Sequence, residues 1–133
     1  MRYMLDTNIV SHIIKGKDKN LLDRLSSIPM QDISISSITE AELFYGLAKC
    51  GHPDGLHKRI REFISRVDVL PWDSSVATIY GNLRASCETI GISLSDMDML
   101  IAAHAVSVGA ILITRDQAFG RIPKGLTIDT WNS

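Results

Sequence analysis

Short apolar runs alternate with longer amphipathic segments along the chain. The runs span two to four residues and most show no polar alternation, which is typical of strands buried on both faces of a parallel sheet. The pattern predicts strands at residues 3–5, 33–36, 69–70, 110–113 and 126–128.

Between these runs, apolar residues recur at the spacing of helices, and most segments begin at a capping residue and end near a glycine. Helices are predicted at residues 7–15, 18–25, 39–51, 56–67, 73–91 and 95–109, with a turn at 52–55 and a short helical turn at 117–119. Strands that alternate with helices predict a three-layer α/β/α sandwich around a parallel sheet of about five strands. No linker or repeat appears, so residues 1–133 are predicted to form one domain.

Composition narrows the class of protein. The 133 residues are 45% hydrophobic, which suffices for a core without disulfides. Cys50 and Cys87 have neither the spacing of a metal site nor the density of a disulfide scaffold, so we expect free thiols. The sequence shows no signal peptide or membrane span, and we therefore expect a soluble, cytoplasmic protein. The formal net charge of −1 neither favours nor excludes a nucleic-acid partner.

Four carboxylates occupy corresponding places in the predicted elements. Asp6 ends the first strand, Glu42 and Asp98 lie in the first turns of the helices expected to begin at Thr39 and Ser95, and Asp116 follows the strand at 110–113. Strand carboxyl ends and helix starts share one edge of a parallel sheet, so all four carboxylates are predicted to converge there.

Two interpretations of this convergence remain open. Each acid could simply cap a helix or a turn, and both Thr39-x-x-Glu42 and Ser95-x-x-Asp98 have the spacing of a capping box. Alternatively, the carboxylates repel one another and a divalent cation relieves the repulsion. Ligands that are all oxygen favour magnesium or manganese over zinc.

Four ordered motifs carry a resemblance to a known family. They are Met-Leu-Asp-Thr-Asn at 4–8, Ser-Ser-Ile-Thr with Glu-Leu-Phe-Tyr-Gly at 36–46, Asp-Met-Leu-Ile-Ala-Ala-His-Ala at 98–105 and Leu-Ile-Thr-Arg-Asp-Gln-Ala-Phe at 112–119. Together they resemble the PIN-domain ribonucleases, and within these the VapC toxins of bacterial toxin–antitoxin pairs. The resemblance covers essentially the whole chain, including a tail with Trp131 seen in an enterobacterial-type branch. One departure is Ala118, where the fourth motif often carries a second aspartate.

The resemblance implies a metal-dependent endoribonuclease with a PIN-like fold. Asp6, Glu42, Asp98 and Asp116 would hold one or two Mg²⁺ or Mn²⁺ ions, and a metal-activated water would attack the RNA phosphodiester. Thr7, Asn8 and Thr114 would orient the carboxylates and waters, although Asn8 could equally be an ordinary residue of the helix start.

The resemblance also implies partners. They are a VapB-type antitoxin, a second copy of the chain in a homodimer, and an RNA substrate, for this branch the anticodon loop of initiator tRNA. A metal-dependent DNA nuclease and a PIN-like binding module with weak activity are the alternatives.

Several other residues can be interpreted from their positions in the predicted elements. Glu40 and Asp96 are predicted to point away from the acids that follow them, and His104 is predicted to be a core histidine rather than a catalyst. A rim that meets phosphates is expected from Lys15, Lys17, Lys19 and Arg115, unless they are merely solvated. Two interpretations, contact with a partner chain and packing in the core, remain for Ile9, Ile13 and Tyr45.

Overall fold

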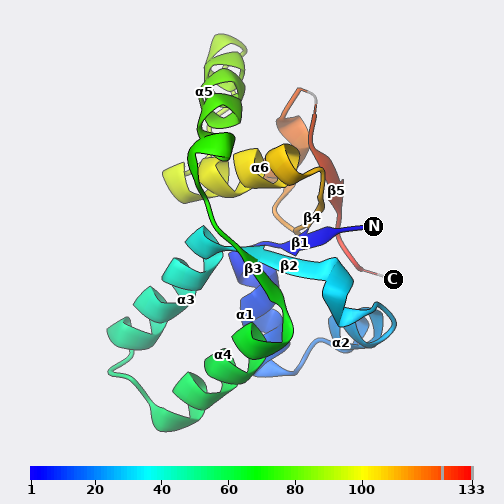
Figure 1. The fold of residues 1–133 in the computed structure, drawn as a ribbon, viewed down its shortest axis with the longest axis vertical. Coiled ribbons are helices and arrows are strands. Elements are labelled where there is room, and N and C mark those ends of the chain that lie inside the picture. Colours follow the sequence, from blue (N-terminus) through cyan, green and yellow to red (C-terminus); the bar gives the residue numbers. More distant parts are fainter. Residues whose placement is uncertain (124, 133) are drawn as a thin grey trace.

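The computed structural model describes residues 1–123 and 125–132, and a five-stranded, wholly parallel sheet lies at its centre (Figure 1). The strand order is β3-β2-β1-β4-β5, so the first strand is the middle one. The strands are β1 (Tyr3–Leu5), β2 (Ile33–Ser36), β3 (Asp68–Leu70), β4 (Ile111–Ile113) and β5 (Thr127–Asp129). Five parallel strands were predicted, and each observed strand lies within one or two residues of its predicted place.

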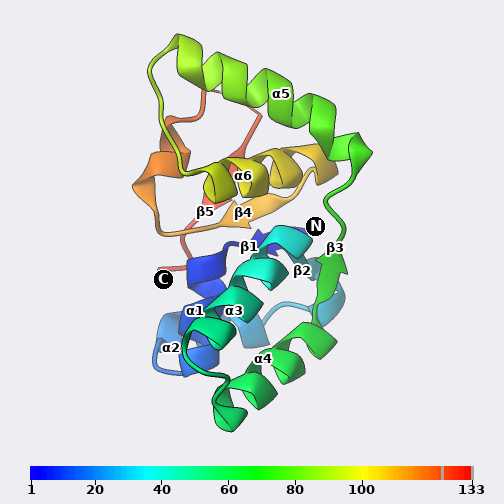
Figure 2. The same cartoon turned by 90° about the vertical axis from the view of Figure 1, so that its left-hand side faces the viewer.

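Helices cover both faces of the sheet, as Figure 2 shows, with α5 and α6 on one side and α1 to α4 on the other. They are α1 (Thr7–Lys15), α2 (Lys19–Ser26), α3 (Ser37–Lys49), α4 (Asp54–Arg66), α5 (Ser74–Thr89) and α6 (Asp96–Val108), with short 3₁₀ turns η1 (Met30–Asp32) and η2 (Gln117–Arg121). The three-layer α/β/α prediction is therefore confirmed. No helix in the described residues is long and apolar enough to cross a membrane.

The core divides into two clusters because successive strand side chains point to opposite faces. Met4 and Leu112 pack with the apolar residues of α5 and α6, whereas Leu5 and Ile113 pack with those of α1, α3 and α4. All four side chains are fully buried. A short strand that is apolar on both faces therefore holds the middle of the sheet, and it ends at Leu5, directly before Asp6.

The start of α3 corrects one prediction. The helix begins at Ser37 and not at Thr39, because β2 runs directly into it and the Ser36 hydroxyl accepts a hydrogen bond from the Ile38 amide at 3.0 Å. Glu42 therefore lies in the second turn of α3, and the proposed capping box of Thr39 and Glu42 does not form. The predicted turn at 52–55 is also too long, since α4 already begins at Asp54.

Candidate metal centre

Asp6 occupies the centre of the candidate site. It follows β1 directly, its side chain is 4% exposed, and one carboxylate oxygen accepts the Ile9 amide of α1 at 2.8 Å. Burial raises the pKa of Asp6, and the nearby charges of Asp98 and Asp116 raise it further, although hydrogen bonds from Thr114 and Ile9 act in the opposite direction. A buried carboxylate thus faces two other acids.

Asp98 and Asp116 come from two other elements, helix α6 and the segment between β4 and η2. Asp98 lies in the first turn of α6, which Ser95 caps through a 3.2 Å hydrogen bond to the Asp98 amide. Burial raises the pKa of Asp98, and the charge of Asp116 adds to this effect, against a lowering hydrogen bond with Ser95. Asp116 is exposed and caps η2 by accepting the Ala118 amide at 2.9 Å.

Capping and metal binding do not exclude each other at these positions. Asp6 and Asp116 each cap with one oxygen, Oδ1, as the capping interpretation predicted. Because each cap uses Oδ1, the other oxygen, Oδ2, is the candidate metal ligand in both residues. Both interpretations of these two residues are therefore compatible.

Two threonine hydroxyls connect the acids. The Thr114 hydroxyl hydrogen-bonds the Asp6 carboxyl and also accepts the Asp116 amide at 3.1 Å. The Thr7 hydroxyl donates to Glu42 Oε1 at 2.5 Å and lies 3.2 Å from the Thr39 hydroxyl. Each of these hydroxyls thus ties two pieces of chain that carry candidate ligands.

Glu42 and Thr7 also lie at a groove between α1, α3 and α4. Its volume is about 210 Å³. Most of its lining is apolar, and Lys15 is the cationic residue among the side chains that form it, which are Thr7, Ser11, Ile14, Lys15, Glu42, Leu43, Gly46, Leu47, Leu56 and Ile60. Glu42 is thus the candidate ligand that also lines this mostly apolar groove.

Comparison with known proteins identifies the family. The family model described as PIN domain matches residues 3–125. The chain belongs to the PIN-domain family.

Its relatives within that family are VapC proteins. The PIN domain is 36% identical to the tRNA(fMet)-specific endonuclease VapC of Shigella flexneri, over 99% of both chains. It is 37% identical to ribonuclease VapC2 of Haemophilus influenzae, over 87% of both. It also superposes with a TM-score of 0.91 on a DNA-bound VapBC crystal structure from Salmonella typhimurium, at 36% identity and 98% coverage of both chains. The VapC-type resemblance is thus confirmed.

The residues of this PIN domain suit a hard divalent cation. PIN nucleases depend on metal in general, and the candidate donors are all oxygens, of which the most buried repel one another. Within residues 1–123 and 125–132, no three acidic, histidine or cysteine side chains are already close enough to hold an ion. Binding an ion would therefore require the carboxylates to reorient.

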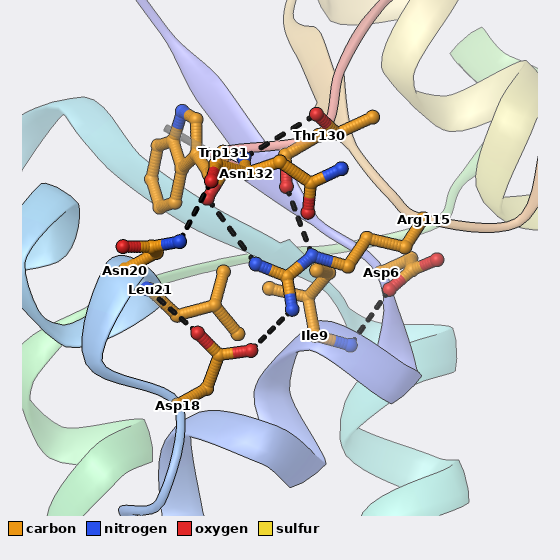
Figure 3. Close-up of polar contacts among 9 residues, drawn as sticks. All are labelled: Asp6, Ile9, Asp18, Asn20, Leu21, Arg115, Thr130, Trp131 and Asn132. Atoms are coloured by element: carbon orange, nitrogen blue, oxygen red, sulfur yellow. Dashed lines mark hydrogen bonds and ion pairs between the residues drawn. The ribbon is translucent and has the colours of Figure 1, made fainter.

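Three further residues that were predicted to belong to the site lie around the carboxylates and not among them. Asn8 is exposed in the first turn of α1, and Lys15 is exposed at the groove. Arg115 extends away from Asp6, toward Asp18 and the C-terminal segment (Figure 3). It therefore faces the tail and not the carboxylates.

The structure also shows where five residues outside the candidate site lie. His104 is buried and its Nδ1 lies 2.8 Å from the Ser36 hydroxyl, as expected of a core histidine. Asp96 pairs with Arg84 at 3.8 Å, at the surface. Ile9 and Ile13 belong to the core, whereas Tyr45 is 68% exposed.

Sequence reasoning missed Thr39, Asp18 and the groove. Thr39 had a usable signal, because residues three apart on a helix share a face and Thr39 precedes Glu42 by three. The contact between Asp18 and Arg115 joins residues 97 positions apart, and no local pattern could reveal it.

Proposed function

We propose that this PIN domain is the toxin of a VapBC-type pair and acts as a Mg²⁺- or Mn²⁺-dependent endoribonuclease that halts growth. The observation that carries the proposal is the buried Asp6, whose pKa is raised by burial and by Asp98 and Asp116. Such a site is unfavourable without a cation, because like charges in a low dielectric destabilise one another. The VapC relatives named as ribonucleases supply the substrate class.

Asp6, Asp98, Glu42 and Asp116 would hold the metal, with Asp6 as the central ligand. A bound divalent ion supplies an activated water and stabilises charge on the phosphate oxygens. The protein side chains do the positioning: Thr114 fixes the Asp6 carboxyl relative to the Asp116 backbone, and Thr7 fixes the Glu42 carboxylate. Asn8, exposed beside Asp6, would orient water or RNA, and Lys15 would meet a phosphate at the rim.

The substrate is proposed to be tRNA, and specifically initiator tRNA. The support is the Shigella relative, which is named a tRNA(fMet)-specific endonuclease and matches over nearly its full length. We further propose that the protein works in the cytoplasm, where this RNA is found, and that it forms a homodimer.

An antitoxin of the VapB type would hold the enzyme inactive. The Salmonella structure contains a VapBC pair. On this chain the groove of α1, α3 and α4 is mostly apolar and includes Thr7 and the candidate ligand Glu42 in its lining. An antitoxin segment with apolar anchors followed by an arginine or lysine would match this surface.

The deciding experiment is incubation of the purified protein with total tRNA, single-stranded RNA and DNA, with EDTA, Mg²⁺ or Mn²⁺. We expect metal-dependent cleavage of RNA only, with a unique product end in initiator tRNA. Cleavage of DNA at a comparable rate would instead support the alternative of a DNA nuclease. Binding of RNA without cleavage by any metal form would support the binding module.

A further inference from the structure

Arg115 lies between two residues of the candidate site but points to the other side of the chain. The Thr114 hydroxyl contacts the Asp6 carboxyl and the Asp116 amide, whereas the Arg115 side chain makes its contacts with Asp18 and the C-terminal segment. In Figure 3 the guanidinium extends away from the Asp6 carboxylate, toward Asp18 and Trp131.

Each of the three guanidinium nitrogens has a protein acceptor. Nε donates to the Thr130 carbonyl at 3.2 Å, Nη2 donates to the Trp131 carbonyl at 3.2 Å, and Nη1 forms an ion pair with Asp18. The Arg115 side chain is 27% exposed and that of Asp18 is 28% exposed. A planar fork with three separated contacts fixes the orientation of an arginine far better than a single ion pair does.

The acceptors are themselves held in place. Trp131 is fully buried and packs against Tyr3 of β1, with ring centroids 5.6 Å apart. The Asn132 carbonyl accepts from the Asn20 side chain at 2.7 Å. Asp18 is the N-cap of α2, where its other oxygen accepts the Leu21 amide at 3.2 Å. The C-terminal segment 130–132 and the start of α2 thus hold the Arg115 guanidinium in one orientation.

The loop that carries Asp116 is held by hydrogen bonds on both sides of that residue. The Asp116 side chain is exposed, its amide donates to the Thr114 hydroxyl at 3.1 Å, and its carbonyl accepts the Phe119 amide at 3.3 Å. Thr114 in turn donates its amide to the Asp129 carbonyl at 3.0 Å, at the end of β5. A shift of residue 115 would therefore move Thr114 and Asp116 together, and with them the partner of the Asp6 carboxyl.

We propose that Arg115 is a positioning residue of the active site, which uses the C-terminal segment 130–132 and Asp18 as an anchor to hold Thr114 and Asp116 in register with Asp6. The proposal rests on the proposed nuclease function for its kinetic consequences only. It replaces the expectation that Arg115 meets RNA phosphate at a rim, because the nitrogens that would do so each contact the protein.

Substitutions at Arg115 distinguish a positioning role from a contact with RNA phosphate. Arg115→Lys keeps the charge and loses the fork, whereas Arg115→Ala loses both. If Arg115 positions the loop, both variants should lower kcat by about 10- to 100-fold, while KM for RNA stays near that of the parent. Arg66→Ala, which removes one positive charge from the exposed end of α4, is the matched control and should leave kcat unchanged.

Asp18→Asn tests the anchor without touching the loop. Asparagine keeps an oxygen to cap α2 but loses the charge that pairs with Arg115. We expect kcat to fall in the same direction as in Arg115→Ala, by a smaller factor, and the double variant to be less damaged than the product of the two single effects. Thermal melting of every variant shows whether the fold is kept.

Two measurements in the absence of RNA make the proposal independent of nuclease activity. Amide hydrogen exchange at Asp116 and Ala118 should quicken in both Arg115 variants and in Asp18→Asn, but not in Arg66→Ala. Calorimetric Mn²⁺ affinity should fall by about 10- to 100-fold in Arg115→Ala. If the parent cleaves no RNA, the proposed function fails, yet these two measurements still decide the role of Arg115.

The opposite pattern would overturn the proposal. A phosphate contact by Arg115 predicts that Arg115→Lys is nearly as active as the parent, and that Arg115→Ala raises KM. It also predicts a change of about 0.7 in the slope of log affinity for single-stranded RNA against log salt concentration. Unchanged amide exchange and Mn²⁺ affinity in Arg115→Ala would likewise exclude positioning.

Discussion

Thr7 donates a hydrogen bond of 2.5 Å to Glu42 and so joins the first turn of α1 to the second turn of α3. The two residues are 35 positions apart, and both line the groove. Glu42 is one of the four candidate ligands, and the Thr7 hydroxyl holds its Oε1. The orientation of the Glu42 carboxylate therefore depends on Thr7.

Thr7→Val tests this dependence because valine keeps the shape and removes the hydroxyl. We expect activity or metal affinity to fall by about 10- to 100-fold, as is usual when a group that orients a metal ligand is lost. Stability should fall by about 1.5–3 kcal/mol, the net contribution of a hydrogen bond to a charged group. Metal titration of cleavage and thermal melting provide the measurements. Thr7→Ser, which retains the hydroxyl, is the control, and equal damage from both variants would contradict the explanation.

Asp6→Asn should abolish cleavage and preserve the fold. Asparagine can still accept the Ile9 amide through its oxygen, but the metal would lose its central anionic ligand. Electrostatic stabilisation by a metal is worth several kcal/mol, which corresponds to a loss of about 100-fold or more in rate. Single-turnover cleavage and growth upon induced expression are the assays. An Asp6→Asn variant as active and as toxic as the parent would remove the basis of the proposed function.

The raised pKa of Asp6 predicts how stability changes with pH in metal-free protein. Because the folded state holds the Asp6 proton more tightly than the unfolded state, the carboxyl contributes stability below its ordinary pKa of about 3.9 and loses that contribution as the pH rises through the raised folded value. The melting temperature of Asp6→Asn relative to the parent should therefore increase from acidic to neutral pH. Added Mg²⁺ should raise the melting temperature of the parent more than that of the variant. A constant difference across the pH range would show that Asp6 is not destabilised by its surroundings.

Trp131 offers a test of how the tail is held. Its side chain is fully buried, yet among the described residues no group accepts a hydrogen bond from its Nε1. Trp131→Phe removes the Nε1–H together with part of the ring system but keeps an aromatic ring in the core, so we expect a smaller loss of stability than truncation causes. Trp131→Ala leaves a cavity and should cost about 3–5 kcal/mol. Denaturant unfolding of both variants measures the difference, and similar losses would contradict the expectation that an aromatic ring alone holds the tail.

The sheet and most helices follow from local patterns in the sequence. Runs such as residues 111–113 are apolar throughout, and caps such as Asp6, Asp18 and Ser95 stand where the helices begin. The start of α3 was mispredicted because Ser36, Ser37 and Thr39 are all competent caps, and only the end of β2 selects among them.

The candidate site was less accessible to sequence reasoning than the fold. The positions of Asp6, Asp98 and Asp116 follow from a parallel sheet, which collects strand ends at one edge. The orientation of Arg115 does not, because its partners Asp18, Thr130 and Trp131 come from distant parts of the chain. Charge alone suggested contact with phosphate, whereas packing of the tail determines where the guanidinium points.

Inhibition by an antitoxin should respond to metal if a basic side chain enters the site. An arginine that pairs with Asp6 or Asp98 would compete with the cation for the same carboxylates. High Mg²⁺ should therefore weaken inhibition when the antitoxin is limiting. An apolar anchor in the groove lined by Leu43, Leu47 and Ile60 would be indifferent to Mg²⁺.

Two antitoxin variants distinguish these contributions. Replacing the entering arginine with alanine leaves the buried carboxylates unpaired, so it should release the nuclease more than replacing an apolar anchor of similar area. The reverse order would show that the groove contact of α1, α3 and α4 dominates. Each variant is titrated against the toxin at low and high Mg²⁺, with cleavage as the readout. Inhibition that depends on neither the arginine nor Mg²⁺ would mean that the antitoxin blocks RNA access without reaching Asp6.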